Sequence, residues 1–197
     1  ETEEANFVVD TLQNFVSEDY SKNEIAILYR SNAQSRIFEE KLIANGIPYR
    51  IYGGFRFFER AEIKDVIAYM RLAVTNSDNN SFERIVNNPP RGIGEKTKNI
   101  LRSIAKEKNK SLYESAKEAI ENSLVPNKAM QSLIEFLNII ETISSILQKD
   151  ELPHQISEII KITGIKSVYE KSKSEQSRSK LENLDELVSA AHEFVHV

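Results

Sequence analysis

Residues 62–74 have the sequence Glu-Ile-Lys-Asp-Val-Ile-Ala-Tyr-Met-Arg-Leu-Ala-Val. Apolar side chains recur in it every three to four positions, from Ile63 through Val66 and Met70 to Val74, with charged side chains between them. This spacing puts the apolar side chains on one face of an α-helix, which buries that face. The stretch therefore predicts an amphipathic helix, and a helical pattern begins here.

The chain after residue 59 keeps this helical periodicity. Polar residues fill 172–180, where we expect an exposed loop. The predicted helices cover residues 62–74, 100–104, 133–147, 153–163 and 181–191. The second part of the chain is therefore predicted to be all-α.

The chain before residue 54 has a different pattern. Residues 7–16 and 37–43 carry apolar side chains at helical spacing, whereas 25–29 and 49–52 are short runs rich in residues that favour strands. A strand, a helix and a second strand in this order predict a parallel β-α-β unit with a right-handed crossover. The fold class expected for the chain is α/β followed by all-α.

Two domains follow from this change of pattern, residues 1–54 and residues 55–197. Two buried parallel strands cannot stand alone, because such strands occur in sheets whose faces and edges are covered by other elements. The missing neighbours predict that this sequence is a segment of a longer protein.

The composition fits a folded cytoplasmic protein. Of the 197 residues, 40% are hydrophobic and 28% are charged, which is enough to bury a core. No apolar run approaches the ~18 residues that span a bilayer, and no secretory signal precedes the first helix. The chain has no cysteine. Its histidines, His154, His192 and His196, are too scattered to suggest a metal site.

Charge is distributed unevenly along the chain, although the net charge is only -4. Residues 1–24 hold seven acidic and one basic side chain, whereas residues 84–110 hold eight basic and two acidic ones. A local basic patch of this kind suits contact with nucleic acid. The alternative is a solvated helix face with surplus lysine, which would give the same excess of basic residues.

The most informative local signal lies within residues 89–97, where Gly92-Ile93-Gly94 joins two helical segments. Glycines on both sides of one apolar residue allow a tight turn, and the next helix begins with a positive potential that attracts phosphate. Arg91, Lys96 and Lys98 add positive charge. We interpret the segment as a helix-hairpin-helix that grips a nucleic-acid backbone without selecting its sequence. The alternative is a plain glycine turn between packed helices.

Polar residues follow the first predicted strand directly, from Arg30 to Arg36. They fall at the carboxyl end of that strand, where α/β sheets usually build their sites. Ser31 or Asn32 could instead serve only as the cap of the following helix.

No phosphate loop of the type Gly-x4-Gly-Lys-Ser/Thr is present, because none of the six glycines has the required neighbours. No nucleophile and base with recognisable spacing occurs either. We therefore assign no catalytic residue to this chain and expect it to bind no cofactor by itself.

Several segments together resemble the UvrD/PcrA/Rep family of superfamily 1 DNA helicases. The resemblance covers nearly the whole chain and is thinner between about residues 110 and 162. The motifs that carry it are Ala26 to Arg36, Pro48 to Arg60 with Glu62 to Asp65, Pro90 to Gly94 and Glu182 to Leu187.

This resemblance implies that residues 1–54 belong to the second RecA-like motor subdomain and residues 55–197 to its helical insert. It implies that Arg30 and Asn32 face single-stranded DNA, and that the Gly92-Ile93-Gly94 hairpin touches the duplex ahead. The parent protein would use ATP and Mg²⁺ to move 3′ to 5′ in DNA repair or replication, with repair or replication proteins as possible partners. The second hypothesis is a stand-alone DNA-binding or partner-docking module without a motor.

Gly53 and Gly54 fall where the first part of the chain gives way to the second, so they predict either a hinge or a tight turn. The aromatic side chains of Phe55, Phe57 and Phe58 follow them. They could stack on bases, although burial between subdomains is the interpretation favoured by their apolar character.

Overall fold

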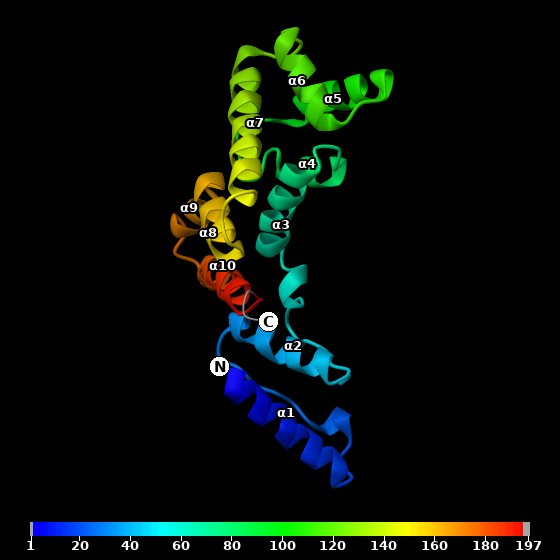
Figure 1. Ribbon diagram of the computed structural model, residues 1–197, viewed down its shortest axis with the longest axis vertical. Helices are drawn as coiled ribbons and strands as arrows, with labels where there is room; N and C mark the ends of the chain where they lie inside the picture. The colour runs from blue at the N-terminus through cyan, green and yellow to red at the C-terminus, as the bar shows by residue number, and fades with distance from the viewer. Residues whose placement is uncertain (1, 195–197) are drawn as a thin grey trace. The chain divides into compact units, whose positions relative to one another are not determined.

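Helices make up the regular structure of this protein, which a computed structural model describes for residues 2–194 (Figure 1). His196 lies outside the described residues. The chain divides into two units, residues 1–60 and 61–197. The first unit contains α1 (Thr2–Ser17), η1 (Lys22–Glu24), η2 (Asn32–Gln34), α2 (Ser35–Ala44) and η3 (Phe57–Glu59). The second contains α3 (Ala61–Val74), α4 (Asn79–Ile85), α5 (Glu95–Lys108), α6 (Leu112–Glu121), α7 (Asn127–Leu147), α8 (Leu152–Thr163), α9 (Ile165–Glu170) and α10 (Glu175–Phe194).

The predicted β-α-β unit, and with it the α/β part of the fold class, is wrong. Residues 25–29 and 49–52 form no strand, and no strand occurs anywhere in residues 2–194. The first segment has the alternating exposure of an extended chain, with Ile27 turned inward and Leu28 92% exposed. A strand also needs a ladder of hydrogen bonds to a neighbour, and no backbone hydrogen bond joins these two segments.

The first unit is held by a small apolar core between α1 and α2. The buried members are Val9, Leu12, Leu42 and Ile47. The extended segments cover its sides with partly buried Ile25, Ile27 and Tyr49. These residues favour strands because they pack well on a half-buried extended surface, and they pack in that way here without pairing.

Glu39 on α2 provides the polar counterpart of this core. Its carboxylate is buried and accepts hydrogen bonds from the hydroxyl of Ser35 (2.7 Å), the hydroxyl of Tyr49 (3.1 Å) and the backbone N–H of Phe57 (3.1 Å). Arg60 donates to the same Ser35 hydroxyl at 2.7 Å. One carboxylate therefore ties both sides of the loop that contains Gly53 and Gly54 to α2.

Helix α3 is central to the second unit, where it packs against α4, α7, α8 and α10. Its face with Ile63, Val66, Tyr69 and Leu72 is fully buried. The spacing of residues 62–74 predicts the burial of Ile63 and Val66 correctly, but Val74, at the end of the predicted face, is 74% exposed. Phe136 on α7 meets the ring of Tyr69 at 6.4 Å and packs edge-on against a ring of α4. The aromatic cluster fixes how α3, α4 and α7 meet.

The segment 172–180, expected to be a loop, is largely helical because α10 begins at Glu175. The hydroxyl of Ser174 accepts a hydrogen bond from the backbone N–H of Ser177 at 3.1 Å, as the side chain of an N-cap does. The buried side chain of Ser177 adds a contact that the polar composition of the segment does not predict.

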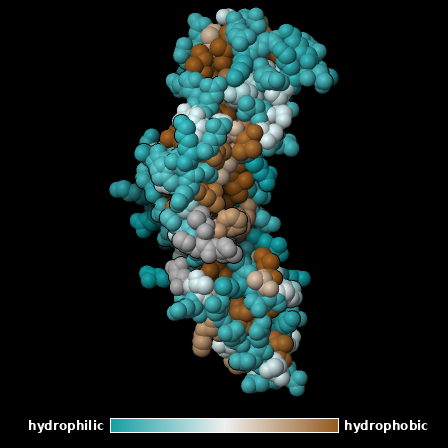
Figure 2. Space-filling model, viewed as in Figure 1, coloured by the Kyte–Doolittle hydropathy of each residue, from teal (hydrophilic) through white to brown (hydrophobic). Residues whose placement is uncertain are grey.

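The surface seen in Figure 2 is mostly hydrophilic, with apolar residues in separate patches. None of the helices in residues 2–194 is both long and apolar enough to cross a lipid bilayer.

Candidate nucleic-acid interface

The glycine hairpin, residues 87–94, joins α4 to α5. Gly92 has a φ angle of +82°, in the left-handed region that glycine adopts without steric cost. Gly94 has a φ angle of −85° and directly precedes α5. The side chain of Ile93 between them is fully buried, while both glycines are exposed. The turn therefore anchors one apolar side chain in the core and leaves the glycine backbone at the surface.

The side chain of Asn87 holds the inner edge of the glycine hairpin. Its Oδ1 atom accepts hydrogen bonds from the backbone N–H groups of Arg91 (2.8 Å) and Ile93 (3.1 Å). From α7, the hydroxyl of Ser132 donates to the backbone carbonyl of Arg91 at 2.7 Å. Three hydrogen bonds thus fix the hairpin backbone from inside the unit.

The outer edge of the hairpin has open backbone amides. The N–H groups of Gly92 and Gly94 donate to no acceptor within residues 2–194. Gly94 is the N-cap of α5 and supplies no side-chain cap, and the first helical hydrogen bond there runs from the N–H of Lys98 to the carbonyl of Gly94 at 3.2 Å. A helix N-terminus also carries a partial positive charge. Together these groups suit an anion such as phosphate.

The guanidinium group of Arg91 is directed into the helical unit. Its Nη2 atom donates to the hydroxyl of Tyr69 at 2.6 Å and to the carbonyl of Thr163, at the end of α8, at 3.1 Å. Its Nη1 atom donates to the carbonyls of Pro89 at 3.0 Å and Ile85 at 3.3 Å. The predicted phosphate ligand is thus already engaged with four oxygen atoms of its own chain.

Two aromatic rings flank this guanidinium, with centroids 5.8 Å (Tyr69) and 5.7 Å (Phe136) from its central carbon. Burial raises the pKa of Tyr69 to about 12, so its hydroxyl keeps its proton at neutral pH. That hydroxyl donates to the carbonyl of Asn88 at 2.9 Å, and the Asn88 side chain donates to Asp65 at 2.7 Å. A continuous polar chain connects Arg91 to α3.

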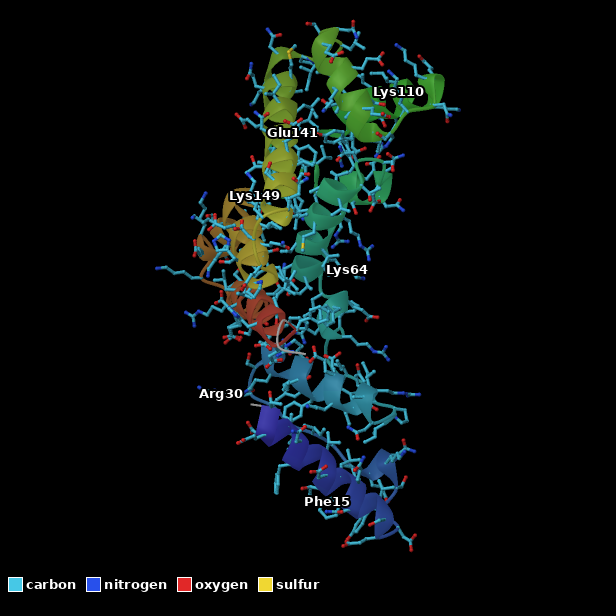
Figure 3. The ribbon with its side chains drawn as sticks, in the orientation of Figure 1. Phe15, Arg30, Lys64, Lys110, Glu141 and Lys149 are labelled. Carbon is cyan, nitrogen blue, oxygen red and sulfur yellow. The ribbon has the colours of Figure 1, made fainter. Side chains whose placement is uncertain are left out.

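Most basic side chains of residues 84–110 are paired with carboxylates. The pairs are Arg84 with Asp65, Lys98 with Glu95, Arg102 with Glu83 and Glu95, and both Lys108 and Lys110 with Glu118. Asp65, Glu83 and Glu118 lie outside the counted stretch, so the count along the sequence missed them. Figure 3 shows Lys110 near one end of the second unit.

Lys96 and Lys98 lie in the first turn of α5 and differ in exposure and ion pairing. Lys96 is exposed and forms no ion pair among the described residues. Lys98 is mostly covered and lies 3.0 Å from Glu95. Hydrogen bonds from Lys98 and Arg102 lower the pKa of Glu95, which keeps that carboxylate ionised beside the open amides. The hairpin therefore combines one unpaired lysine with a second lysine that a neighbouring carboxylate restrains.

Arg30, labelled in Figure 3, lies in the loop before η2, Ser31 is the N-cap of η2 and Asn32 is its first residue. The hydroxyl of Ser31 accepts a hydrogen bond from the backbone N–H of Ala33 at 3.3 Å. The side chain of Gln34 accepts from the backbone N–H groups of Arg30 at 3.0 Å and Ser31 at 3.1 Å. Ser31 and Gln34 are thus the capping residues, and the side chains of Arg30 and Asn32 are exposed.

Gly53 and Gly54 lie in an exposed loop between Tyr49 and Phe57, which both donate hydrogen bonds to Glu39. Gly53 has a φ angle of +82°, as a tight turn requires, whereas Gly54 does not have a positive φ angle. A hinge at these glycines stays a prediction. Of the aromatic residues that follow, Phe57 is buried (1% exposed), whereas the side chains of Phe55 and Phe58 are exposed.

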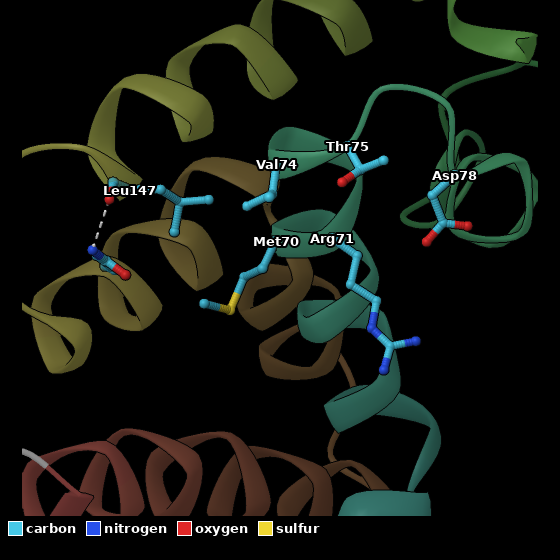
Figure 4. Close-up of a pocket in the computed structure, with 7 residues that line it drawn as sticks. Met70, Arg71, Val74, Thr75, Asp78 and Leu147 are labelled. Atoms are coloured by element: carbon cyan, nitrogen blue, oxygen red, sulfur yellow. Dashed lines mark hydrogen bonds between the residues drawn. The ribbon is translucent and has the colours of Figure 1, made fainter.

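A pocket of about 640 Å³ opens on the second unit between α3, α7 and α8. Figure 4 shows Met70, Val74 and Leu147 facing one another, with Arg71 and Asp78 directed away from them. The side chain of Gln155 donates to the carbonyl of Leu147 at 3.2 Å. No three His, Asp or Glu side chains in residues 2–194 gather in a way that could hold a metal ion.

The two hairpin glycines should respond differently to alanine. Gly92→Ala forces an L-residue into the left-handed region, which costs about 1–2 kcal/mol. Gly94→Ala has an ordinary φ angle and open space around the added methyl group, so it adds no strain and should cost less than about 1 kcal/mol, from the lower preference for alanine at the N-cap of α5. Urea unfolding followed by circular dichroism measures both variants. Equal losses at the two positions would contradict the geometry of the turn.

Comparison with known proteins gives matches over almost the whole chain. The sequence pattern of one family, described as UvrD-like helicase C-terminal domain, matches residues 1–196. DNA helicase II of Escherichia coli (strain K12) is 39% identical over 194 residues, which are 98% of this chain and 27% of that protein. DNA helicase II of Haemophilus influenzae is 40% identical, over 99% of this chain and 27% of that protein.

A third relative is the ATP-dependent DNA helicase PcrA of Staphylococcus epidermidis, which is 33% identical over 98% of this chain and 26% of its own length. The chain therefore spans about a quarter of the length of these relatives. The matches confirm the resemblance that the motifs indicate. This chain belongs to the UvrD-like helicase C-terminal domain family.

Proposed function

We propose that this chain is part of an ATP-dependent DNA helicase that moves 3′ to 5′, and that it contributes single-strand and duplex contacts rather than nucleotide hydrolysis. The observation that carries this proposal is the match of residues 1–196 to a helicase domain family. The relatives are named as DNA helicases and extend well beyond the matched segment. DNA, without sequence preference, is the partner that the open backbone amides of the hairpin suit best.

In this proposal, ATP and Mg²⁺ bind to parts of the protein outside the 197 residues of this sequence. The chain has no glycine loop of the type that cradles phosphates, and residues 2–194 hold no cluster of carboxylates for a metal ion. The residues present do not fit the nucleotide, so no step of its hydrolysis is assigned to them. We expect the isolated chain to hydrolyse no ATP.

In the proposed duplex contact, the amides of Gly92 and Gly94 and the start of α5 face a phosphate group, and Lys96 and Lys98 supply charge. Backbone amides bind phosphate in any sequence, which suits a protein that must act on all DNA. A methyl group at Gly94 would stand beside these amides and keep a phosphate at a distance, although the fold tolerates it. The carboxylate of Glu95 competes with the phosphate for Lys98.

Replacing Lys96 and Lys98 together by alanine should flatten the slope of log affinity against log salt for duplex DNA. Each lysine that neutralises one phosphate contributes about 0.9 to that slope, so the expected change is about 2 units. Glu95→Gln should act in the opposite direction, because it releases Lys98 from its ion pair. Fluorescence anisotropy across a salt series measures all three proteins.

The matched control for this experiment is the double replacement of Lys64 and Lys149, which removes the same charge elsewhere on the second unit (Figure 3). Both lysines are exposed, and the control should keep the original slope. A slope that stays unchanged in the Lys96/Lys98 variant would reduce the hairpin to a packing turn between helices.

Replacing Arg30 and Asn32 by alanine in the full-length protein should weaken single-strand binding and the ATP turnover that DNA stimulates. Their side chains are exposed and the cap is made by Ser31 and Gln34, so stability should change little. Ser31→Ala serves as the control that removes the cap instead. Unchanged single-strand affinity would exclude the proposed role, and a full-length protein without DNA-stimulated turnover would favour the stand-alone module.

A further inference from the structure

The glycine hairpin has two sets of backbone amides with different partners. The amides of Arg91 and Ile93 share one acceptor, the Oδ1 atom of Asn87. The amides of Gly92 and Gly94 alternate with them along the chain and have no acceptor within residues 2–194. The side chain of Asn87 therefore decides which amides are used inside the protein and which remain for a ligand.

The backbone and the side chain of Arg91 are held by different parts of the second unit. Its carbonyl accepts a hydrogen bond from Ser132 on α7, and its amide is held by Asn87. Its guanidinium is held by Tyr69 on α3 and by Thr163 at the end of α8. The planar guanidinium offers five donors in a fixed geometry, so it can serve these separated oxygen atoms at once where an ammonium group could not.

Reaching a phosphate would require Arg91 to give up these contacts. Three of its acceptors are backbone carbonyls, those of Ile85, Pro89 and Thr163, and they would lose their only charged donor. The guanidinium would also leave the faces of Tyr69 and Phe136. Losing several partners at once opposes such a movement, because partly buried polar groups are costly to leave unpaired.

We propose that Asn87 and Arg91 are positioning residues that hold the open amides of Gly92 and Gly94 in phosphate-binding geometry, and that Arg91 contacts no phosphate itself. This inference rests on the proposed duplex contact and specifies how the hairpin makes it. Asn87 sets the direction of the amides within the turn. Arg91 fixes the turn relative to α3, α7 and α8.

The first test is the salt dependence of duplex binding in Arg91→Gln, measured beside Lys96→Ala. A positioning residue acts on geometry, so Arg91→Gln should lower duplex affinity about tenfold and leave the salt slope unchanged. Lys96→Ala should flatten the slope by about 0.9. Arg91→Lys should fail to restore affinity, because a single ammonium group cannot reproduce the fork of hydrogen bonds. A slope flattened by about 0.9 in Arg91→Gln, or full affinity in Arg91→Lys, would overturn the positioning role.

The second test needs no DNA and uses amide hydrogen exchange by NMR. Asn87→Ala removes the acceptor, so the amides of Arg91 and Ile93 should exchange about tenfold faster or more, whereas buried amides of α7 stay protected. Asn87→Asp keeps an acceptor oxygen and should restore their protection. Unaltered exchange in Asn87→Ala would contradict the role of Asn87 even if that protein binds duplex normally.

The two tests separate this inference from the proposed function. If the Lys96/Lys98 variant keeps its salt slope, the duplex contact itself fails, while the exchange experiment still decides whether Asn87 holds the turn. If that variant behaves as expected and Arg91→Gln also flattens the slope, only the positioning role of Arg91 fails. Circular dichroism confirms that each variant is folded before either comparison is made.

Discussion

Arg91 joins segments of the helical unit that are far apart in the sequence. It donates to Tyr69 on α3 and, 72 residues along the chain, to the carbonyl of Thr163 at the end of α8. That carbonyl belongs to the last turn of a helix, where backbone carbonyls lack helical partners and the potential is negative. A cation at this point satisfies the helix end and, through its own backbone, fixes the turn beside it. In this account, the glycine hairpin keeps its shape because the guanidinium of Arg91 is hydrogen-bonded inside the second unit.

Most other basic side chains near the hairpin are also engaged within the protein. A stretch rich in basic side chains becomes a surface with few unpaired cations, because carboxylates from α3, α4 and α6 neutralise most of it. Lys96 and the restrained Lys98 remain next to the open amides. Binding of DNA at this hairpin would therefore depend on backbone geometry as much as on charge, and Glu95 would moderate its strength.

The sequence predicted that the second unit is helical and where the hairpin lies, because both depend on local spacing, but it did not predict α6 or α9. Residues 62–74 form the predicted helix and bury Ile63 and Val66, although Val74 is exposed, and Ile93 is buried between two exposed glycines. The predicted strands failed because Ile27 and Leu28 favour an extended chain, whereas a strand also needs a partner that periodicity cannot supply. The count of basic side chains over residues 84–110 also misled, because Asp65, Glu83 and Glu118, which pair with several of them, lie outside that stretch.

Two contacts of the Arg91 side chain, with Tyr69 and Thr163, lie beyond any local pattern, since these partners are 22 and 72 residues away. The contacts of Asn87 are closer in sequence, four and six residues away, but they exceed the two-residue reach of the usual asparagine turn, so that pattern does not predict them either. The residues that sequence patterns miss here are those that hold the hairpin in place. The sequence singles out the glycines and lysines at its surface, and their role in binding stays a prediction.

The most direct measurement is a titration of the ¹⁵N-labelled chain with short duplex DNA, followed by NMR. It reports on the backbone amides of the hairpin and on the Nε–H group of Arg91 in the same sample. We expect the amides of Gly92 and Gly94 and those at the start of α5 to shift, while the Nε–H resonance of Arg91 stays in place. A large shift of the Arg91 side chain with unmoved glycine amides would contradict an interface built from a backbone that the protein's interior holds in place.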